Sequence, residues 1–349
     1  MSPARLPASA LLRPLIAVLA TLAILATVGP GAAVAATNPG APFRFFAPGS
    51  PWNLQLPRTA PLNASSAEMV GALSREVRRE LETDQGPSIS TTSNSVPIYT
   101  VPANQPTVPV QLTSTFTVPA LSAAWSAVPL PANAQSAPGK DHHLVVWQPS
   151  TDRLWEFWHL LDGAEGWQAG WGGAMQNVST NFGVYGPTAW PGATGSWGGS
   201  ASSLSIAGGL ITLEDLQKGE INHALAIGVP QVRANQYAAP AERTDGTSTS
   251  PMALPEGAHL RLEPGLELWR LHLPRLTLMI ARAAKRYGIF VRDVAGNVTF
   301  YAQDPVTAGG NPYAGPSGFL EGTYPARLLS TFPWTHLQLL QMQLTSSAG

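Results

Sequence analysis

Apolar residues recur at helical spacing in three stretches of the chain. In "SSAEMVGALSREVRREL" the apolar positions from Met69 to Leu81 fall mostly three or four residues apart, behind Ser65 or Ser66 as a cap. The segment "TLEDLQKG" has Thr212 in capping position and a glycine at its end, and residues 274–288 begin with proline and end with glycine. Each of these patterns predicts a helix.

Alternating apolar and polar residues predict strands in much of the remaining chain. Residues 37–62 are rich in proline and aromatic residues, which indicates an extended arm packed onto the body. Residues 85–138 hold pieces such as "VPVQLTSTFTV" between proline turns, although a linker is the alternative for 85–110. The segment "HHLVVWQPSTDRLWEFWHL" predicts a hairpin around the turn "PSTD".

The second half of the chain continues this pattern. "EINHALAIGV" predicts a buried strand, "LPEGAHLRLEP" a further strand, and "IFVRDVAGNVTFYAQ" a hairpin that turns at residues 295–297. Many short strands with two or three peripheral helices predict a mainly β fold, either a β-sandwich or jelly-roll-like. We expect an N-terminal arm and helix over 37–84 and one β-rich main domain over 85–349; a split near residue 210 is the alternative.

Residues 1–36 have the order of an export signal. Basic residues precede an apolar run of 14 residues, "LIAVLATLAILATV", and small residues follow it as far as Ala36. An uncleaved membrane anchor is the alternative, but a spanning helix needs about 20 apolar residues. We therefore expect cleavage near Ala36, an extracellular protein and no stable membrane insertion afterwards.

Composition narrows the class of partner. Without residues 1–36 the chain keeps 18 basic and 21 acidic residues and has no basic stripe, which argues against a nucleic-acid partner. Charged residues make up only 12%, about half the usual share, and uncharged polar surfaces suit polysaccharides and oligosaccharides. The chain has no cysteine, which excludes thiol catalysis and thiolate metal sites.

Tryptophan is concentrated in one region, since seven of the eleven lie between Trp147 and Trp197. Indole rings stack on the C–H faces of sugar rings, and they also fill hydrophobic cores. Within the expected strand, alternation sets Glu156 and Trp158 against Trp155 and Phe157 on the opposite face. The candidates for sugar binding are Trp155, Trp158, Trp167 and Trp171.

Glu156 is the leading catalytic candidate, because a carboxyl group among tryptophans has a pKa raised by desolvation, as a general acid needs. The alternative is a buried structural glutamate that hydrogen-bonds to the backbone or to an arginine. We expect its partner carboxylate to be Glu220, Asp162 or Asp293. Retention would require the pair to lie about 5 to 5.5 Å apart.

Two histidines complete the set of candidate catalytic residues. His143 begins a strand and His223 interrupts an apolar one, so each is either a hydrogen-bonded core residue or a member of a proton-transfer set. They would also serve as two ligands of a metal, but the chain has no HExxH motif and no EF-hand loop. We therefore expect neither a metal nor another cofactor.

Five segments carry a family resemblance. They are "PGSPWNLQLP", "HHLVVWQPSTDRLWEFW", "GEINHAL", "LPEGAHLRLEP" and "AKRYGIFVRDVAGNVTFYAQDP". Together they resemble an uncharacterised family of exported actinobacterial proteins over most of the mature chain, which implies one shared design and hands over no catalytic residue. The chain also has a more distant similarity to jelly-roll polysaccharide lyases and glycosidases. It differs from the family-16 glycosidases because it lacks their acidic E-x-D-x-E pattern. "INH" at 221–223 is similar to the Q-I-H strand of alginate-lyase folds, whose partner motifs are missing.

These observations lead to one main hypothesis and two alternatives. The main hypothesis is a secreted carbohydrate-active enzyme, an endo-acting glycoside hydrolase on a cell-wall or plant polysaccharide with a carboxylate pair in a tryptophan-lined groove. The first alternative is a non-catalytic glycan-binding protein of the cell surface. The second is a structural envelope protein without a ligand site.

Overall fold

The computed structural model describes residues 44–116 and 118–347, so the expected export signal lies outside the described residues. Of the three helices expected from the sequence, all form, as α1 (Ser66–Glu82), α3 (Leu213–Lys218) and α4 (Arg275–Arg286). Two short helices, α2 (Pro119–Ala124) and α5 (Pro325–Leu329), are additional. The structure is sheet-rich with few helices, which confirms the mainly β prediction.

The helix ends follow the sequence in one case and depart from it in another. Thr212 accepts a hydrogen bond from the backbone N–H of Asp215, whose side chain returns a bond to Thr212, and Gly219 closes α3 in the left-handed region. In α1, neither expected serine caps the helix. Ser65 makes no side-chain capping bond. The hydroxyl of Ser66 instead accepts a hydrogen bond from the backbone N–H of Leu339, so it is used in a tertiary contact and not in a cap.

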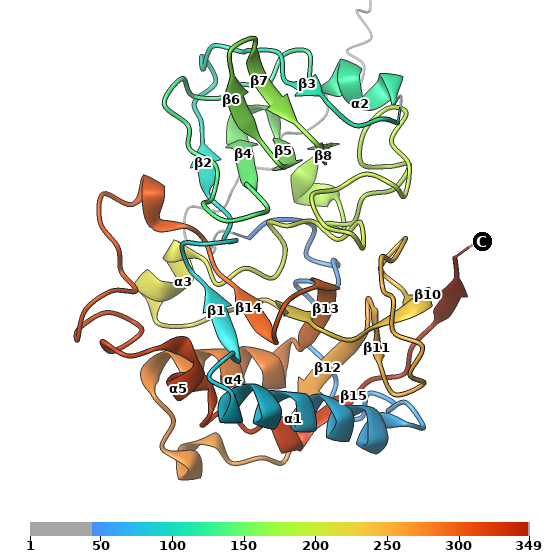
Figure 1. Ribbon diagram of the computed structural model, residues 1–349, viewed down its shortest axis with the longest axis vertical. Helices are drawn as coiled ribbons and strands as arrows, with labels where there is room; N and C mark the ends of the chain where they lie inside the picture. The colour runs from blue at the N-terminus through green and yellow to red at the C-terminus, as the bar shows by residue number, and fades with distance from the viewer. Residues whose placement is uncertain (1–43, 117, 348–349) are drawn as a thin grey trace, which may run out of the picture. The chain divides into compact units, whose positions relative to one another are not determined.

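The largest sheet has six strands in the order β1-β14-β9-β13-β12-β15 (Figure 1). Their bounds are Ser88–Ser90, Thr299–Tyr301, Leu225–Val229, Ile289–Val294, His259–Leu262 and Leu337–Leu339. The helices α1 and α4 pack against this sheet, α1 on β15 and α4 on β12 and β9. Because β1 belongs to this sheet, the linker alternative for residues 85–110 is wrong.

The predicted hairpin of β13 and β14 does not form. Strand β9 lies between them, parallel to β13 and antiparallel to β14. Every residue of β9 is buried, as suits a central strand, and two strands that flank a third are about 10 Å apart. The connection over 295–298 is long enough to span that distance, so a turn signal between two strands did not guarantee their pairing.

A second sheet holds four strands in the order β2-β4-β5-β8. Here the predicted hairpin is confirmed: β4 (Leu144–Gln148) pairs antiparallel with β5 (Arg153–Trp158) around a short helical turn, and β5 pairs with β8 (Trp171–Gln176). Strand β2 (Ile98–Thr100) pairs parallel with β4. Both faces of β5 are buried from Leu154 to Phe157.

Two three-stranded sheets complete the described chain. One has the order β3-β7-β6 with bounds Gln111–Leu112, Gly166–Ala169 and Leu161–Gly163. The other has the order β11-β10-β16 with bounds Leu254–Glu256, Val232–Ala238 and Leu344–Ser346. Among the described residues, five of the twelve strand pairings are parallel. The finer expectation of a β-sandwich or jelly roll stays a prediction.

The interior contains two hydrophobic clusters. The first is built mostly by residues 46–210 and includes buried Phe46 and Trp52, so the described part of the proline-rich arm packs onto the body as expected. The second is built by residues 69–89 and 211–339, where α1 and α4 contribute one face each. The boundary between these clusters falls near residue 210, but contacts group residues 44–349 into one unit.

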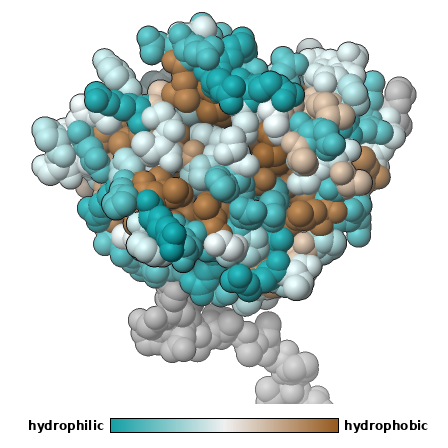
Figure 2. Space-filling view, turned by 90° about the horizontal axis from the view of Figure 1, so that it is seen from below, coloured by the Kyte–Doolittle hydropathy of each residue, from teal (hydrophilic) through white to brown (hydrophobic). Residues whose placement is uncertain are grey.

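The surface is mixed rather than strongly charged. Figure 2 shows one face on which apolar side chains gather in patches between hydrophilic ones. Single large apolar side chains such as Phe116, Trp269 and Tyr324 are exposed elsewhere along the described chain. Within residues 44–116 and 118–347, the helices are all too short or too polar to cross a membrane.

Candidate active site

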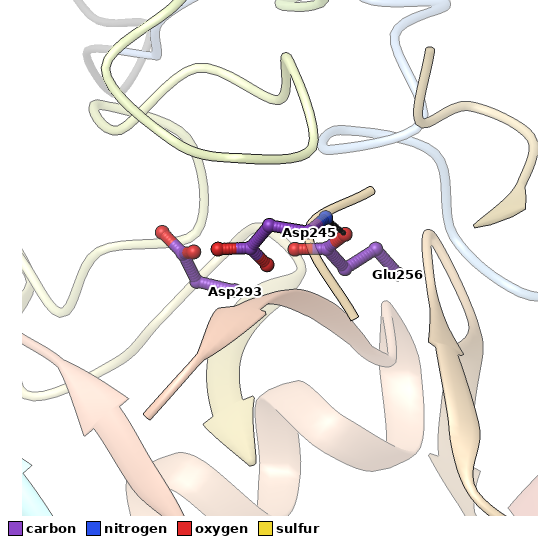
Figure 3. A group of neighbouring side chains, drawn as sticks. All are labelled: Asp245, Glu256 and Asp293. Carbon is purple, nitrogen blue, oxygen red and sulfur yellow. Dashed lines mark hydrogen bonds between the residues drawn. The ribbon is translucent and has the colours of Figure 1, made fainter. Parts of the chain in front are cut away.

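Three carboxylates from separate segments meet at one place. Asp245, Glu256 and Asp293 each place one oxygen so that these atoms all lie within 4.8 Å of one another. Figure 3 shows the three side chains next to one another, with Asp245 between Asp293 and Glu256. Asp245 is exposed, Asp293 is partly exposed and Glu256 is fully buried, so the cluster reaches from the interior to solvent. Like charges this close repel one another, which makes the cluster the strongest candidate for proton chemistry.

A β-bulge positions Asp293. In the parallel pair of β13 and β9, Val291 faces Ile227 and Asp293 faces Gly228, so Arg292 is an extra residue in its strand. The guanidinium of Arg292 turns into the core, where Nη1 donates to the carbonyls of Ile206 (3.0 Å) and Gly208 (3.1 Å). Bulges re-aim side chains near active sites, and here the bulge leaves Asp293 partly open to solvent.

A tight turn buries Glu256. The next residue, Gly257, has a φ of 81°, and a Cβ there would lie 1.7 Å from the carbonyl oxygen of Ala238. Only glycine fits this close approach, so the "PEG" segment must turn at this point. The turn leaves Glu256 at the end of β11 with its carboxylate enclosed, and its Oε2 accepts a hydrogen bond from the backbone N–H of Asp245 at 3.2 Å.

Arg243 holds the segment that carries Asp245. Its Nε donates to Ser203 Oγ at 2.9 Å and its Nη2 donates to the carbonyl of Ser200 at 2.6 Å. Burial lowers the pKa of this guanidinium, while the charges of Asp293, Glu256 and Asp245 raise it. Arg243 therefore ties the "RTDG" segment to the loop over 198–203 and places a positive charge beside the three acids.

The environment separates the proton affinities of these acids. Burial, followed by the charge of Asp293, raises the pKa of Glu256 to about 9. Burial, followed by the charge of Asp245, raises the pKa of Asp293 to about 7, against the opposing effects of Arg292 and the backbone N–H of Ala201. Burial also raises the pKa of Asp245. At neutral pH Glu256 holds a proton and Asp293 exchanges one.

Two kinds of chemistry fit this donor set. A partly exposed acid with a pKa near the working pH can give and take a proton from a bound molecule. Three carboxylate oxygens are also ligands that a hard cation such as Ca²⁺ accepts, and these residues would hold one if the protein uses a metal. The expectation of no metal and no cofactor therefore stays a prediction.

Two aromatic side chains of the second sheet connect to the acids through neighbouring residues. Trp158 is 38% exposed and its Nε1 donates to Asp141 Oδ1 at 3.4 Å, while the charge of Asp141 also raises the pKa of Asp293. Trp171 is partly exposed and donates to the carbonyl of Ser196 at 2.8 Å. The loop from Ser196 to Ala201 therefore links the indole of Trp171 to the acid cluster.

The four tryptophans expected to bind sugar have different surroundings. Trp158, Trp167 and Trp171 keep exposed surface. The expectation that Trp155 binds sugar is corrected by its surroundings: Trp155 is buried and its Nε1 donates to the carbonyl of Ala124 at 3.1 Å. Because β5 is covered on both faces, its ring fills the core and cannot stack on a bound ligand.

Glu156 has the surroundings of a structural carboxylate. It is 0% exposed and accepts hydrogen bonds from Ser205 Oγ and from the backbone N–H of Ala207 (3.0 Å). Burial raises its pKa as expected, but the charge that acts on it is that of Arg292, not a second acid. The alternative of a buried glutamate held by the backbone fits these contacts, and direct contact with a substrate does not.

The other expected catalytic residues hydrogen-bond to partners other than Glu156. His143 is buried with Nε2 3.2 Å from the carbonyl oxygen of Gly199, and burial lowers its pKa to about 4. Nε2 of His223 lies 3.1 Å from Oδ2 of Asp215 on α3. Glu220 is exposed and accepts a hydrogen bond from the side-chain amide of Asn222. Each is held by separate neighbours. The contacts of the two histidines are those of hydrogen-bonded core residues, which was the alternative expected from the sequence.

Sequence inspection found one member of the acid cluster and missed two. Asp293 was a candidate partner carboxylate, but Asp245 and Glu256 stand in "RTDG" and "PEG", which look like ordinary turns. The available signal was an acid followed directly by glycine, which occurs at 245–246 and again at 256–257. That pattern does not show that the two turns meet.

Comparison of the chain with protein-family models, with curated proteins and with solved structures gave no match. The resemblance to exported actinobacterial proteins therefore stays a prediction, and the function has to be inferred from the acid cluster and its neighbours.

Proposed function

We propose that this protein is an exported carbohydrate-active hydrolase in which Asp293 and Asp245 form the catalytic carboxylate pair. The observation that carries the proposal is the position of Asp293, a partly exposed acid with a pKa of about 7 beside an exposed second acid. A general acid works best when its pKa lies near the working pH, and an adjacent carboxylate supplies the nucleophile or base.

The three acids take different roles in this proposal. Asp293 protonates the leaving oxygen, because with a pKa of about 7 it is protonated in about half of the molecules at neutral pH. Asp245 is the exposed partner and acts as the nucleophile in its ionised form. Glu256 is a positioning residue: it is fully buried, cannot touch a substrate, and accepts a hydrogen bond from the backbone of Asp245.

The spacing predicts the stereochemical outcome. One oxygen from each of the three acids lies within 4.8 Å of the chosen oxygens of the other two. Retaining glycosidases hold their carboxyl groups about 5 to 5.5 Å apart, whereas inverting enzymes need roughly 6.5 to 9.5 Å to admit a water molecule. The proposed hydrolase therefore retains configuration at the anomeric carbon.

The substrate class is supported by the surroundings of the pair. Trp158 and Trp171 offer partly exposed indole rings, and both connect to the acids through Asp141 and the loop over 196–201. Such rings bind the apolar faces of sugars without needing charge, which agrees with the low charged fraction of 12%. An endo-acting glycoside hydrolase on a cell-wall or plant polysaccharide is the specific form that we propose.

Release of reducing ends from a panel of polysaccharides tests the proposal. We expect Asp293→Asn and Asp245→Asn each to lower the rate by about 10² to 10⁴, the usual contribution of a catalytic acid or base. The matched control is Asp84→Asn, since Asp84 is exposed and adopts a positive φ that asparagine tolerates. Binding of a glycan without release of reducing ends, abolished by Trp158→Ala, would instead establish the non-catalytic glycan-binding alternative.

A further inference from the structure

A second site lies away from the acid cluster. A pocket of about 850 Å³ is lined by the N-terminal arm at Leu56 and Arg58, by residues 220–222, by the connection over 264–269 and by α4. Five of the chain's 20 lysines and arginines line it, but only two of its 21 acids do. Because the chain as a whole is close to neutral, this concentration of positive charge sets the pocket apart.

Part of this charge has a structural use. Arg261 donates Nη1 to the carbonyl of Pro57 at 2.9 Å and Nε to Gln338 at 3.0 Å, and Lys285 donates to the carbonyl of Leu266 at 2.6 Å. These two side chains hold the walls of the pocket together. They explain why the arm and the 264–269 connection stay in place against α4.

The remaining arginines are not neutralised by the acids of the pocket. Glu267 pairs with Arg270 at 2.6 Å, outside the pocket lining, and Glu220 accepts a hydrogen bond from Asn222. Arg286 lies over the ring of Tyr287, 5.3 Å from its centroid. Arg58 and Arg282 are exposed, and among the described residues neither forms an ion pair. Two guanidinium groups are therefore free to meet an anion at the mouth of the pocket.

The rest of the lining is apolar. Leu266, Leu268 and Leu278 are only partly covered, and Trp269 is 71% exposed beside them. A pocket of this size with apolar walls and a few polar groups is the usual form of a small-molecule site. Burial of a hydrocarbon against the apolar walls is favourable. The arginines favour a carboxylate or phosphate, which guanidinium binds through two parallel hydrogen bonds.

We propose that this pocket binds an anionic amphiphile, a molecule with an acidic head group on an apolar body. Charge complementarity selects the head group, through Arg58 and Arg282, and the leucine-rich wall selects the body. A neutral sugar would leave the two guanidiniums unpaired, and a small inorganic anion would leave the leucines in contact with water. This site is independent of the proposed glycan hydrolysis, because none of its residues belongs to the acid cluster.

Decanoate is a suitable probe, and the exposed indole of Trp269 is a natural reporter. We expect decanoate to change the tryptophan fluorescence of the full chain saturably, with decanol binding at least 10-fold more weakly and acetate not binding. Trp269→Phe should remove most of the fluorescence change while calorimetry still detects binding. The paired variant Arg58→Ala with Arg282→Ala should weaken decanoate at least 10-fold and leave decanol unaffected.

The matched control is Arg327→Ala, which removes an exposed arginine from α5. Thermal unfolding establishes that each variant folds, and the milder changes Arg58→Gln and Arg282→Gln replace the alanine variants if they do not. Equal binding of decanol and decanoate, an unchanged affinity in the arginine variants, or no saturable binding of decanoate would each overturn the proposal. Tight binding of an oligogalacturonate in place of decanoate would also overturn it, because the body of the ligand would then be polar.

Discussion

The buried carboxyl group of Glu256 accepts a hydrogen bond from the backbone N–H of Asp245 at 3.2 Å. This contact joins the strand end at β11 to the exposed "RTDG" segment, which lies in a different turn of the chain. Because Glu256 is enclosed and sits beside two further acids, its protonated form is favoured in the folded state. Folding therefore takes up a proton at this position, with consequences for stability.

Glu256→Gln should stabilise the protein increasingly as the pH rises. The pKa of Glu256 is about 9 in the folded state against 4.5 ordinarily, so between these values the folded state binds more protons than the unfolded one. The stability that protonated Glu256 contributes to the folded state is therefore lost as the pH rises from about 4.5 to about 9. Relative to the wild type, the free energy of unfolding of the variant should gain roughly 4 kcal/mol between pH 5 and pH 8.

Chemical denaturation at the two pH values measures this difference. Glu82→Gln is the matched control, since Glu82 is exposed at the end of α1. A difference between Glu256→Gln and the wild type that is the same at both pH values would show that Glu256 is ionised throughout.

The rate of glycan hydrolysis should fall as the pH rises through about 7. Asp293 acts as general acid only in its protonated form, and its pKa is about 7. Initial rates between pH 5 and pH 9 should therefore trace an alkaline limb near pH 7. An alkaline limb above pH 9, or none, would remove Asp293 from that role.

How far the sequence predicts this structure depends on the range of the interactions. The cap of α3 and the hairpin of β4 and β5 follow from neighbouring residues, and both are as expected. The failed hairpin of β13 and β14 shows the limit, because β9, from an earlier part of the chain, inserts between them. Local pattern decides the element, and tertiary packing decides its partner.

The same limit applies to the candidate site. The aromatic setting of Glu156 correctly indicated a desolvated carboxyl group with a raised pKa. It did not show that Ser205 Oγ and the backbone N–H of Ala207 already donate hydrogen bonds to that carboxyl group. Asp245 and Asp293 are 48 positions apart in the sequence, and only the folded chain brings them together.

Glu156→Gln should leave glycan hydrolysis within about twofold of the wild type, because the amide oxygen can still accept from Ser205 and Ala207. Glu156→Ala should instead lower the free energy of unfolding by about 2 to 4 kcal/mol, since it leaves buried donors unpaired and opens a cavity. Activity assays and denaturation curves separate the two effects. A loss of 100-fold or more in a folded Glu156→Gln protein would restore Glu156 as a catalytic residue.

Asp215→Asn should destabilise the protein more at pH 6 than at pH 8. Despite burial, the charge of Asp215 raises the pKa of His223, and the charge of His223 lowers that of Asp215. The stability from His223 is complete below its unfolded pKa of about 6.5 and is lost as the pH rises through its raised folded value. We expect a loss of about 1 to 2 kcal/mol at pH 6 and less at pH 8.

Glu214→Gln on the same helix is the control, because Glu214 pairs with Lys218 at the surface and contributes only tenths of a kcal/mol. A loss for Asp215→Asn that does not depend on pH would mean that His223 is neutral and that the variant acts only through the helix cap.

The proton affinity of Asp293 is the quantity on which the proposed hydrolase depends most. A carboxyl ¹³C NMR titration with labelled aspartate, assigned by comparison with Asp293→Asn, measures it directly. The expected pKa is about 7 in the wild type and lower in Asp245→Asn, where the repelling neighbour is removed. A value near 4 in both proteins would contradict the account, because Asp293 would then be an ordinary ionised acid with no proton to donate at neutral pH.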